Sequence, residues 1–101
     1  MDEQRRVAEF VARNDLETPP EFRLLDLVSE LGEVAKNATE STDYGDDPAS
    51  LDLDSDEIGD VCFALFALAE SIDVDVGDAL DEAISKYEAR LDEDGSPASG
   101  E

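Results

Sequence analysis

The run from Val61 to Ala69 is apolar at every position. The residues in and around it that are spaced three and four apart, as on one face of an α-helix, are Ile58, Cys62, Leu65, Ala69 and Ile72. Phe63 and Ala67 point away from that face, so this helix is apolar on all sides and has to be covered on all sides. In a chain of 101 residues, a second subunit is one way to cover it. We therefore expect a homodimer with this helix near its centre, and a dimer of dimers stays open.

Three other segments show helical spacing, at about residues 2–14, 19–39 and 76–91. Thr18-Pro19-Pro20-Glu21 predicts the start of the second helix, with threonine as N-cap, proline at the first helical position and Glu21 closing a capping box. Asp54 and Asp75 are the expected N-caps of the third and fourth helices. The sequence therefore predicts an all-α, four-helix bundle-like domain over residues 1–91, completed by homodimerisation. Residues 92–101 are expected to be a disordered acidic tail.

Charge excludes several classes of function. The chain has 29 acidic and seven basic residues, no histidine, and a net charge of −22. Nucleic acids and anionic membranes are polyanions bound mainly through lysine and arginine, so we expect neither as a partner. Salt relieves the self-repulsion of such a chain, because the Debye length falls from about 10 Å at 0.1 M to about 3 Å at 1 M. We therefore expect a halophilic protein adapted to a salt-rich cytoplasm.

The single cysteine and the absence of long apolar runs restrict the kinds of cysteine site and the cellular location that we expect for this protein. Cys62 cannot form an intramolecular disulfide or a cysteine zinc site, and its apolar surroundings suggest a small core residue. No basic-then-apolar start is present, and no apolar run approaches the roughly 20 residues of a membrane span. We expect a soluble, cytoplasmic protein.

One pattern, Glu-(Leu/Ile)-Gly-(Glu/Asp)-Val, occurs twice, at residues 30–34 and 57–61. Residues three apart are neighbours on a helix, so each copy offers two carboxylates side by side. Glycine inside a helix costs about 0.5–1 kcal/mol relative to alanine, and close approach of a second helix or a ligand would explain its repetition. We expect two facing helices to form a metal site from the four acids, which are Glu30, Glu33, Glu57 and Asp60.

The chemistry left to this chain is that of carboxylates. Histidine-dependent mechanisms are unavailable, and no Walker loop, dinucleotide fingerprint or EF-hand loop is present. Two like charges 4 Å apart cost roughly 4 kcal/mol at an effective dielectric of 20, and a divalent cation removes that cost. Oxygen ligands favour Mg²⁺ first and Mn²⁺ second, and magnesium sites are often completed by substrate phosphates. The predicted ligand is therefore a polyphosphate.

Substrate contacts are expected from outside the acidic motif. Lys86 and Arg90 lie four apart on one helix flank, where they either bind phosphate or lie along the bundle with their charges in water. Tyr44, in the polar connection 40–54, and Asn37 are further candidates for substrate binding. Glu33 lies about 160° from the centre of its helix's apolar stripe, so an active role for Glu33 requires another layer to cover that face.

The acidic motifs resemble the signature of the MazG-like all-α nucleoside triphosphate pyrophosphohydrolases, E-E-x-x-E followed after a gap by E-x-x-D. Glu30 and Glu33 match the first part and Glu57 and Asp60 the second, whereas Ser29 replaces the opening glutamate. The similarity extends over roughly residues 20–91. It implies a helical bundle completed by dimerisation, magnesium held by the four acids, and a nucleoside monophosphate and pyrophosphate as products. The number of metal ions stays open because of Ser29.

By this resemblance, we expect a magnesium-dependent hydrolase in which metal-activated water attacks the α-phosphorus of a (deoxy)nucleoside triphosphate. Glu30 or Glu33 would be the catalytic base, and Lys86 and Arg90 would hold phosphate oxygens. Two alternatives remain. One is a phosphoribosyl-ATP pyrophosphohydrolase of the same superfamily, and the other is a non-enzymatic helical dimerisation or regulatory module whose acids are a salt-adapted surface.

Overall fold

The computed structural model describes residues 2–94 as helices joined by turns and one longer loop. The α-helices are α1 (Asp2–Arg13), α2 (Pro20–Ser41), α3 (Ser55–Ser71) and α4 (Val76–Asp94), and a short 3-10 helix, η1 (Pro48–Ser50), interrupts the loop between α2 and α3. No strand occurs within these residues. The predicted all-α class with four helices is therefore confirmed.

The start of α2 differs from the prediction. The N-cap is Pro19, not Thr18, with φ of −57° and ψ of 149°, and no side chain caps this end. The cause is Pro20, because a residue that precedes a proline is pushed from the helical region into an extended conformation. Glu21 consequently stands at the second helical position, and the predicted capping box is wrong. Asp54 and Asp75 do precede α3 and α4, and Asp75 accepts a hydrogen bond from the backbone N–H of Asp78 at 3.0 Å.

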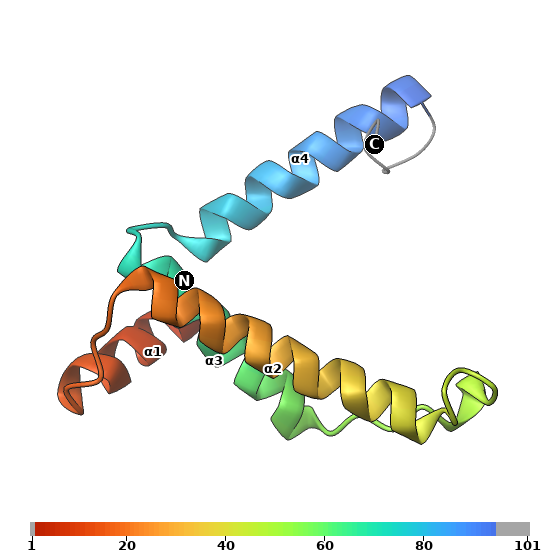
Figure 1. Ribbon diagram of the computed structural model, residues 1–101. Helices are drawn as coiled ribbons and strands as arrows, with labels where there is room; N and C mark the ends of the chain where they lie inside the picture. Colours follow the sequence, from red (N-terminus) through yellow and green to blue (C-terminus); the bar gives the residue numbers. More distant parts are fainter. Residues whose placement is uncertain (1, 95–101) are drawn as a thin grey trace.

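α3 is the central helix, packed between α1 and α2 (Figure 1). α2 and α3 run antiparallel, as expected for neighbours joined by one loop. The side chains of α2 that are buried or half-buried and are spaced three and four apart are Arg23, Leu27, Glu30, Val34, Asn37 and Ser41. This spacing is that of a seam between two helices. Glu30 and Asn37 therefore lie in the contact between α2 and α3.

The spacing of apolar residues in the sequence predicts another inward face for α2, which does not coincide with this seam. That predicted apolar stripe consists of Leu24, Leu27, Val28, Leu31, Val34, Ala35 and Ala38. Leu24, Val28 and Leu31 of that stripe are each half exposed or more, because α2 is rotated so that its polar positions meet α3. Only part of the stripe, including Leu27 and Val34, is half-buried. The predicted inward face of α2 is thus only partly correct for the single chain.

The contacts that attach α1 to the remainder of the fold include one aromatic pair and one buried amide. The rings of Phe10 and Phe63 meet edge to face, with centroids 5.8 Å apart. Gln4, buried in α1, donates to the carbonyl of Val74 and accepts from the backbone N–H of Val76, each at 2.7 Å. These bonds fix the turn from which α4 starts.

α4 projects away from the other three helices (Figure 1). The radius of gyration is 16.7 Å, whereas a compact domain of this length has about 13 Å. Four apolar side chains of α4 lie on one face of the helix and remain 43–55% exposed; we call them the α4 stripe, and they are Leu80, Ile84, Tyr87 and Leu91. The described chain is therefore a three-helix unit with a projecting fourth helix, not a closed four-helix bundle.

The helix predicted to be covered on all sides is only partly covered. Its buried apolar residues are the alanines Ala64, Ala67 and Ala69, whereas Ile58 is 48% exposed. No helix of residues 2–94 combines the length and apolar character needed to cross a membrane. At the carboxyl end, α4 continues to Asp94, into the segment expected to be a tail, and residues 95–101 lie outside the described residues.

Candidate functional site

A hollow of about 320 Å³ lies between α2 and α3. Its lining residues are Arg23, Asp26, Glu30, Asp60, Phe63 and Ala64. Glu30 and Asp60, one from each copy of the repeated motif, thus line the same hollow from facing helices. Phe63 and Ala64 give the hollow an apolar wall on the side of α3.

Glu57 lies further along the same seam, nearer the loop between the helices. The side-chain amide of Asn37 donates a hydrogen bond to Oε1 of Glu57. Oε2 of the same carboxylate is buried and has no hydrogen-bond partner within the described part of the chain. A buried carboxylate oxygen without a donor is costly, and a cation is one way to satisfy it.

The four predicted ligands do not form one closed set in the single chain. Glu33 is exposed and does not line the hollow, in agreement with its predicted direction away from the helix's apolar face. Across residues 2–94, no three acidic side chains stand close enough together to hold a metal ion. Glu30 and Asp60 line one hollow, and Glu57 accepts a hydrogen bond from Asn37. Glu33 is exposed and does not line the hollow.

The repeated glycines do not serve close packing within the chain. A Cβ placed on Gly32 or Gly59 would meet no atom within 4 Å. Gly59 borders a second hollow of about 750 Å³ between α1 and α3, which Asp60 does not line. The expected close approach is therefore wrong for the helices of this chain, and a ligand or a second subunit is the remaining explanation.

The predicted substrate contacts lie away from the hollow. Lys86 and Arg90 flank Tyr87 on α4, with Nζ of Lys86 5.1 Å and Cζ of Arg90 5.7 Å from the ring centroid. Tyr44 follows α2 in a left-handed conformation, with φ of 58°, and is 78% exposed. Asn37, already engaged by Glu57, is the one predicted substrate contact that lies in the seam between α2 and α3.

The sequence motifs do not single out two charged residues of the hollow, Arg23 and Asp26. Asp26, Glu30, Glu33 and Asn37 follow one another at intervals of four, three and four, so they form a single polar stripe on α2. This spacing would have included Asp26. Arg23 lies seven residues before Glu30 on the seam, but nothing in the sequence separates it from the other arginines.

The comparisons with known proteins leave the family open. No family model matches the chain, and no solved structure matches it. The chain is 38% identical over 68 residues to the uncharacterized protein YpjD of Bacillus subtilis (strain 168). That alignment covers 63% of this chain and 60% of the relative.

Proposed function

We propose that the protein is a magnesium-dependent nucleoside triphosphate pyrophosphohydrolase that converts a (deoxy)nucleoside triphosphate into the monophosphate and pyrophosphate. The observation that carries the proposal is the pairing of Glu30 with Asp60 in one hollow between α2 and α3. Together with Glu33 and Glu57, these residues supply the acids of the MazG-like pattern. Ser29 departs from that pattern, and Asp26, one turn away in the same hollow, offers a replacement carboxylate.

The residues fit a hard divalent cation. All candidate ligands are carboxylates, and the Oε2 atom of Glu57 is buried with no hydrogen-bond donor in the described residues. Oxygen donors of this kind select Mg²⁺ and Mn²⁺. When bound, magnesium offsets phosphate charge and makes a coordinated water more acidic.

The chain's own residues supply a general base for the reaction and an apolar side of the hollow. Hydrolysis joins the oxygen of one water to the α-phosphorus and breaks the bond from that phosphorus to the oxygen that leaves with pyrophosphate. A carboxylate takes the proton of the water. Glu30 is favoured over Glu33 for this role because Glu30 lines the hollow, where Phe63 provides an apolar side.

The active form in this proposal is a homodimer. Within residues 2–94 the single chain buries no large apolar side chain completely, and both the α4 stripe and Leu24, Val28 and Leu31 of α2 are exposed. Packing the α4 stripe of one copy on the α2–α3 layer of another would cover both surfaces. It would also bring Lys86 and Arg90, which do not line their own chain's hollow, toward the partner's carboxylates.

The deciding experiment measures pyrophosphate release from a panel of ribo- and deoxynucleoside triphosphates with magnesium in molar salt. We expect equal amounts of monophosphate and pyrophosphate, and a loss of about 100-fold or more in Glu30→Gln and Asp60→Asn. Glu82→Gln, an exposed change on α4, is the matched control. Undiminished release by both site variants would contradict the proposal.

The same panel separates the alternatives. Including phosphoribosyl-ATP shows whether that compound is preferred to every nucleoside triphosphate. A protein that releases pyrophosphate from none of the compounds, yet forms the dimer, is a helical dimerisation module instead.

A further inference from the structure

Arg23 is a basic side chain in an unusual place for so acidic a protein. It is only 8% exposed, and it is the only basic residue of the described chain that is buried. The guanidinium has five donor N–H groups, and the structure gives it one hydrogen bond, from Nη2 to the carbonyl oxygen of Leu16. Within residues 2–94, Arg23 forms no ion pair with a carboxylate. The other guanidinium nitrogens are not among the buried side-chain atoms that lack a partner, so they open onto solvent while the rest of the side chain is buried, and this arrangement needs an explanation.

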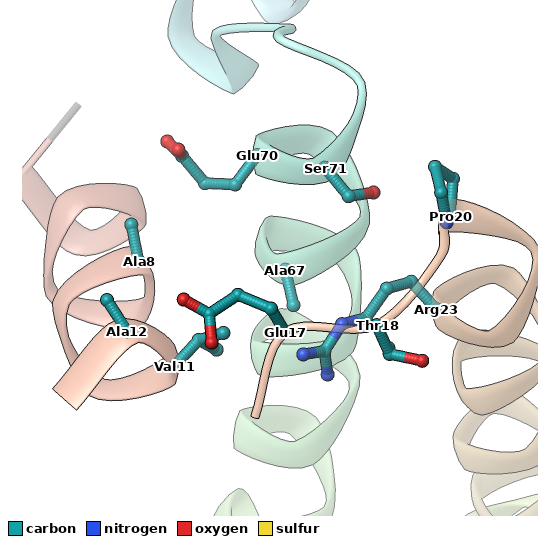
Figure 2. Close-up of a pocket in the computed structure, with 10 residues that line it drawn as sticks. All are labelled: Ala8, Val11, Ala12, Glu17, Thr18, Pro20, Arg23, Ala67, Glu70 and Ser71. Atoms are coloured by element: carbon teal, nitrogen blue, oxygen red, sulfur yellow. The ribbon is translucent and has the colours of Figure 1, made fainter. Parts of the chain in front are cut away.

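The position of Arg23 supplies one. The side chain lines the acidic hollow beside Asp26, Glu30 and Asp60. It also lines a neighbouring hollow of about 340 Å³ beneath the segment that joins α1 to α2, where it reaches from α2 toward α3 beside Thr18 (Figure 2). The bond to Leu16 holds the guanidinium at the boundary between the two hollows and leaves the other donors free.

The chemistry of this arrangement suits a phosphate group. A guanidinium presents donors in a planar fork that matches phosphate oxygens, and it stays charged at any physiological pH. The carboxylates of the acidic hollow repel a polyphosphate that enters it. The positive charge of Arg23 at the edge of the hollow attracts the phosphate oxygens and so offsets part of this repulsion. Lys86 and Arg90 do not line this hollow in their own chain.

We propose that Arg23 is a phosphate-binding residue of the hollow between α2 and α3, which holds a non-bridging oxygen of the substrate's polyphosphate. This assignment rests on the proposed hydrolase function and deepens it. It makes each chain's own hollow the place where the phosphate chain is bound, whichever subunit supplies Lys86. A structural role, in which Arg23 only ties the segment of Leu16 to α2, is the competing explanation.

The test measures binding of magnesium tripolyphosphate by calorimetry at fixed ionic strength. Arg23→Gln should weaken this binding by about tenfold or more, and Arg23→Lys should recover part of the loss because it keeps the charge but not the fork. Binding of Mn²⁺ alone should not weaken in Arg23→Gln, since Arg23 is no metal ligand and the loss of its positive charge favours a cation in the hollow. Arg13→Gln, which removes an exposed arginine stacked on Phe10, is the matched control and should bind as wild type does.

A measurement on the unaltered protein covers the case in which both Arg23 variants fail to fold. In protein labelled with ¹⁵N at arginine, the guanidinium signal of Arg23 should shift when magnesium tripolyphosphate is added, and that of Arg13 should not. Binding with no shift at Arg23, or equal affinity of wild type and Arg23→Gln, overturns the assignment and leaves the hydrolase standing. Absence of tripolyphosphate binding by wild type overturns both.

Discussion

The side-chain amide of Asn37 donates a hydrogen bond to one oxygen of Glu57, and the other oxygen of that carboxylate is buried without a partner in the described chain. The bond fixes the position of Glu57 at the seam between α2 and α3. The unpaired oxygen makes the same site costly in the absence of a cation, because an unsatisfied buried group costs about 1–3 kcal/mol and more when charged. Such a local cost is typical of a site shaped for a ligand.

Asn37→Ala tests the first half of this relationship. Removing the donor leaves the whole Glu57 carboxylate unsatisfied, so the free energy of unfolding should fall by about 1–3 kcal/mol. Urea unfolding at constant salt measures the change. In a Glu57→Gln background the same substitution should cost less, because no charge is then left without a donor. Equal costs in the two backgrounds would show that the negative charge of Glu57 contributes nothing to the cost of losing Asn37.

Glu57→Gln tests the second half. Neutralising the buried group should leave the metal-free protein at least as stable as wild type, and it should abolish most of the rise in Tm that magnesium produces. Thermal unfolding with a chelator and with excess Mg²⁺ at matched ionic strength measures both effects. Glu82→Gln on α4 is the control and should keep the full magnesium response. A full response in Glu57→Gln would remove Glu57 from the metal site.

The sequence predicts where the helices lie along the chain more reliably than it predicts which side of each helix packs against its neighbours. The sequence predicts a cluster of four acids because similar motifs recur on two neighbouring helices, and the structure places two of them, Glu30 and Asp60, in one hollow. The sequence does not predict the rotation of α2, because its strongest apolar stripe, with Leu24 and Val28, favours packing of a different face. A stripe of this kind can equally serve contact with another subunit. The start of α2 is a second example. Because Pro20 forces Pro19 into an extended conformation, the N-cap is Pro19 and not the predicted Thr18.

Gly59→Ala and Gly32→Ala examine why glycine recurs in both motifs. Because a methyl group at either position meets no atom of the described chain, alanine should raise the free energy of unfolding by about 0.5–1 kcal/mol. Urea unfolding of each variant provides the value, and sedimentation provides the oligomeric state. A variant that is destabilised and also monomeric would instead place the partner subunit against that glycine.

Ile84→Glu tests whether the α4 stripe is a dimer contact. A charge in the middle of this stripe should shift the mass measured by sedimentation equilibrium in molar salt from that of a dimer to that of a monomer. Ser85→Glu adds the same charge one residue away, off the stripe, and should leave the dimer intact. A wild-type chain that sediments as a monomer, or an Ile84→Glu protein that stays dimeric, would exclude the α4 stripe from the contact.

Mixing two inactive variants, Glu30→Gln and Lys86→Gln, tests whether Lys86 on the projecting helix α4 serves the hollow of its own chain or that of the partner. If Lys86 serves the partner's hollow, a dimer of one Glu30→Gln chain and one Lys86→Gln chain has one site with neither residue and one complete site. Subunit exchange between equal amounts of the two variants should therefore restore about a quarter of the wild-type rate, since half of the dimers are mixed. If Lys86 serves the hollow of its own chain, every site in the mixture lacks one residue and no activity returns. The rate of pyrophosphate release before and after exchange decides between the two arrangements, and mixing either variant with itself is the control.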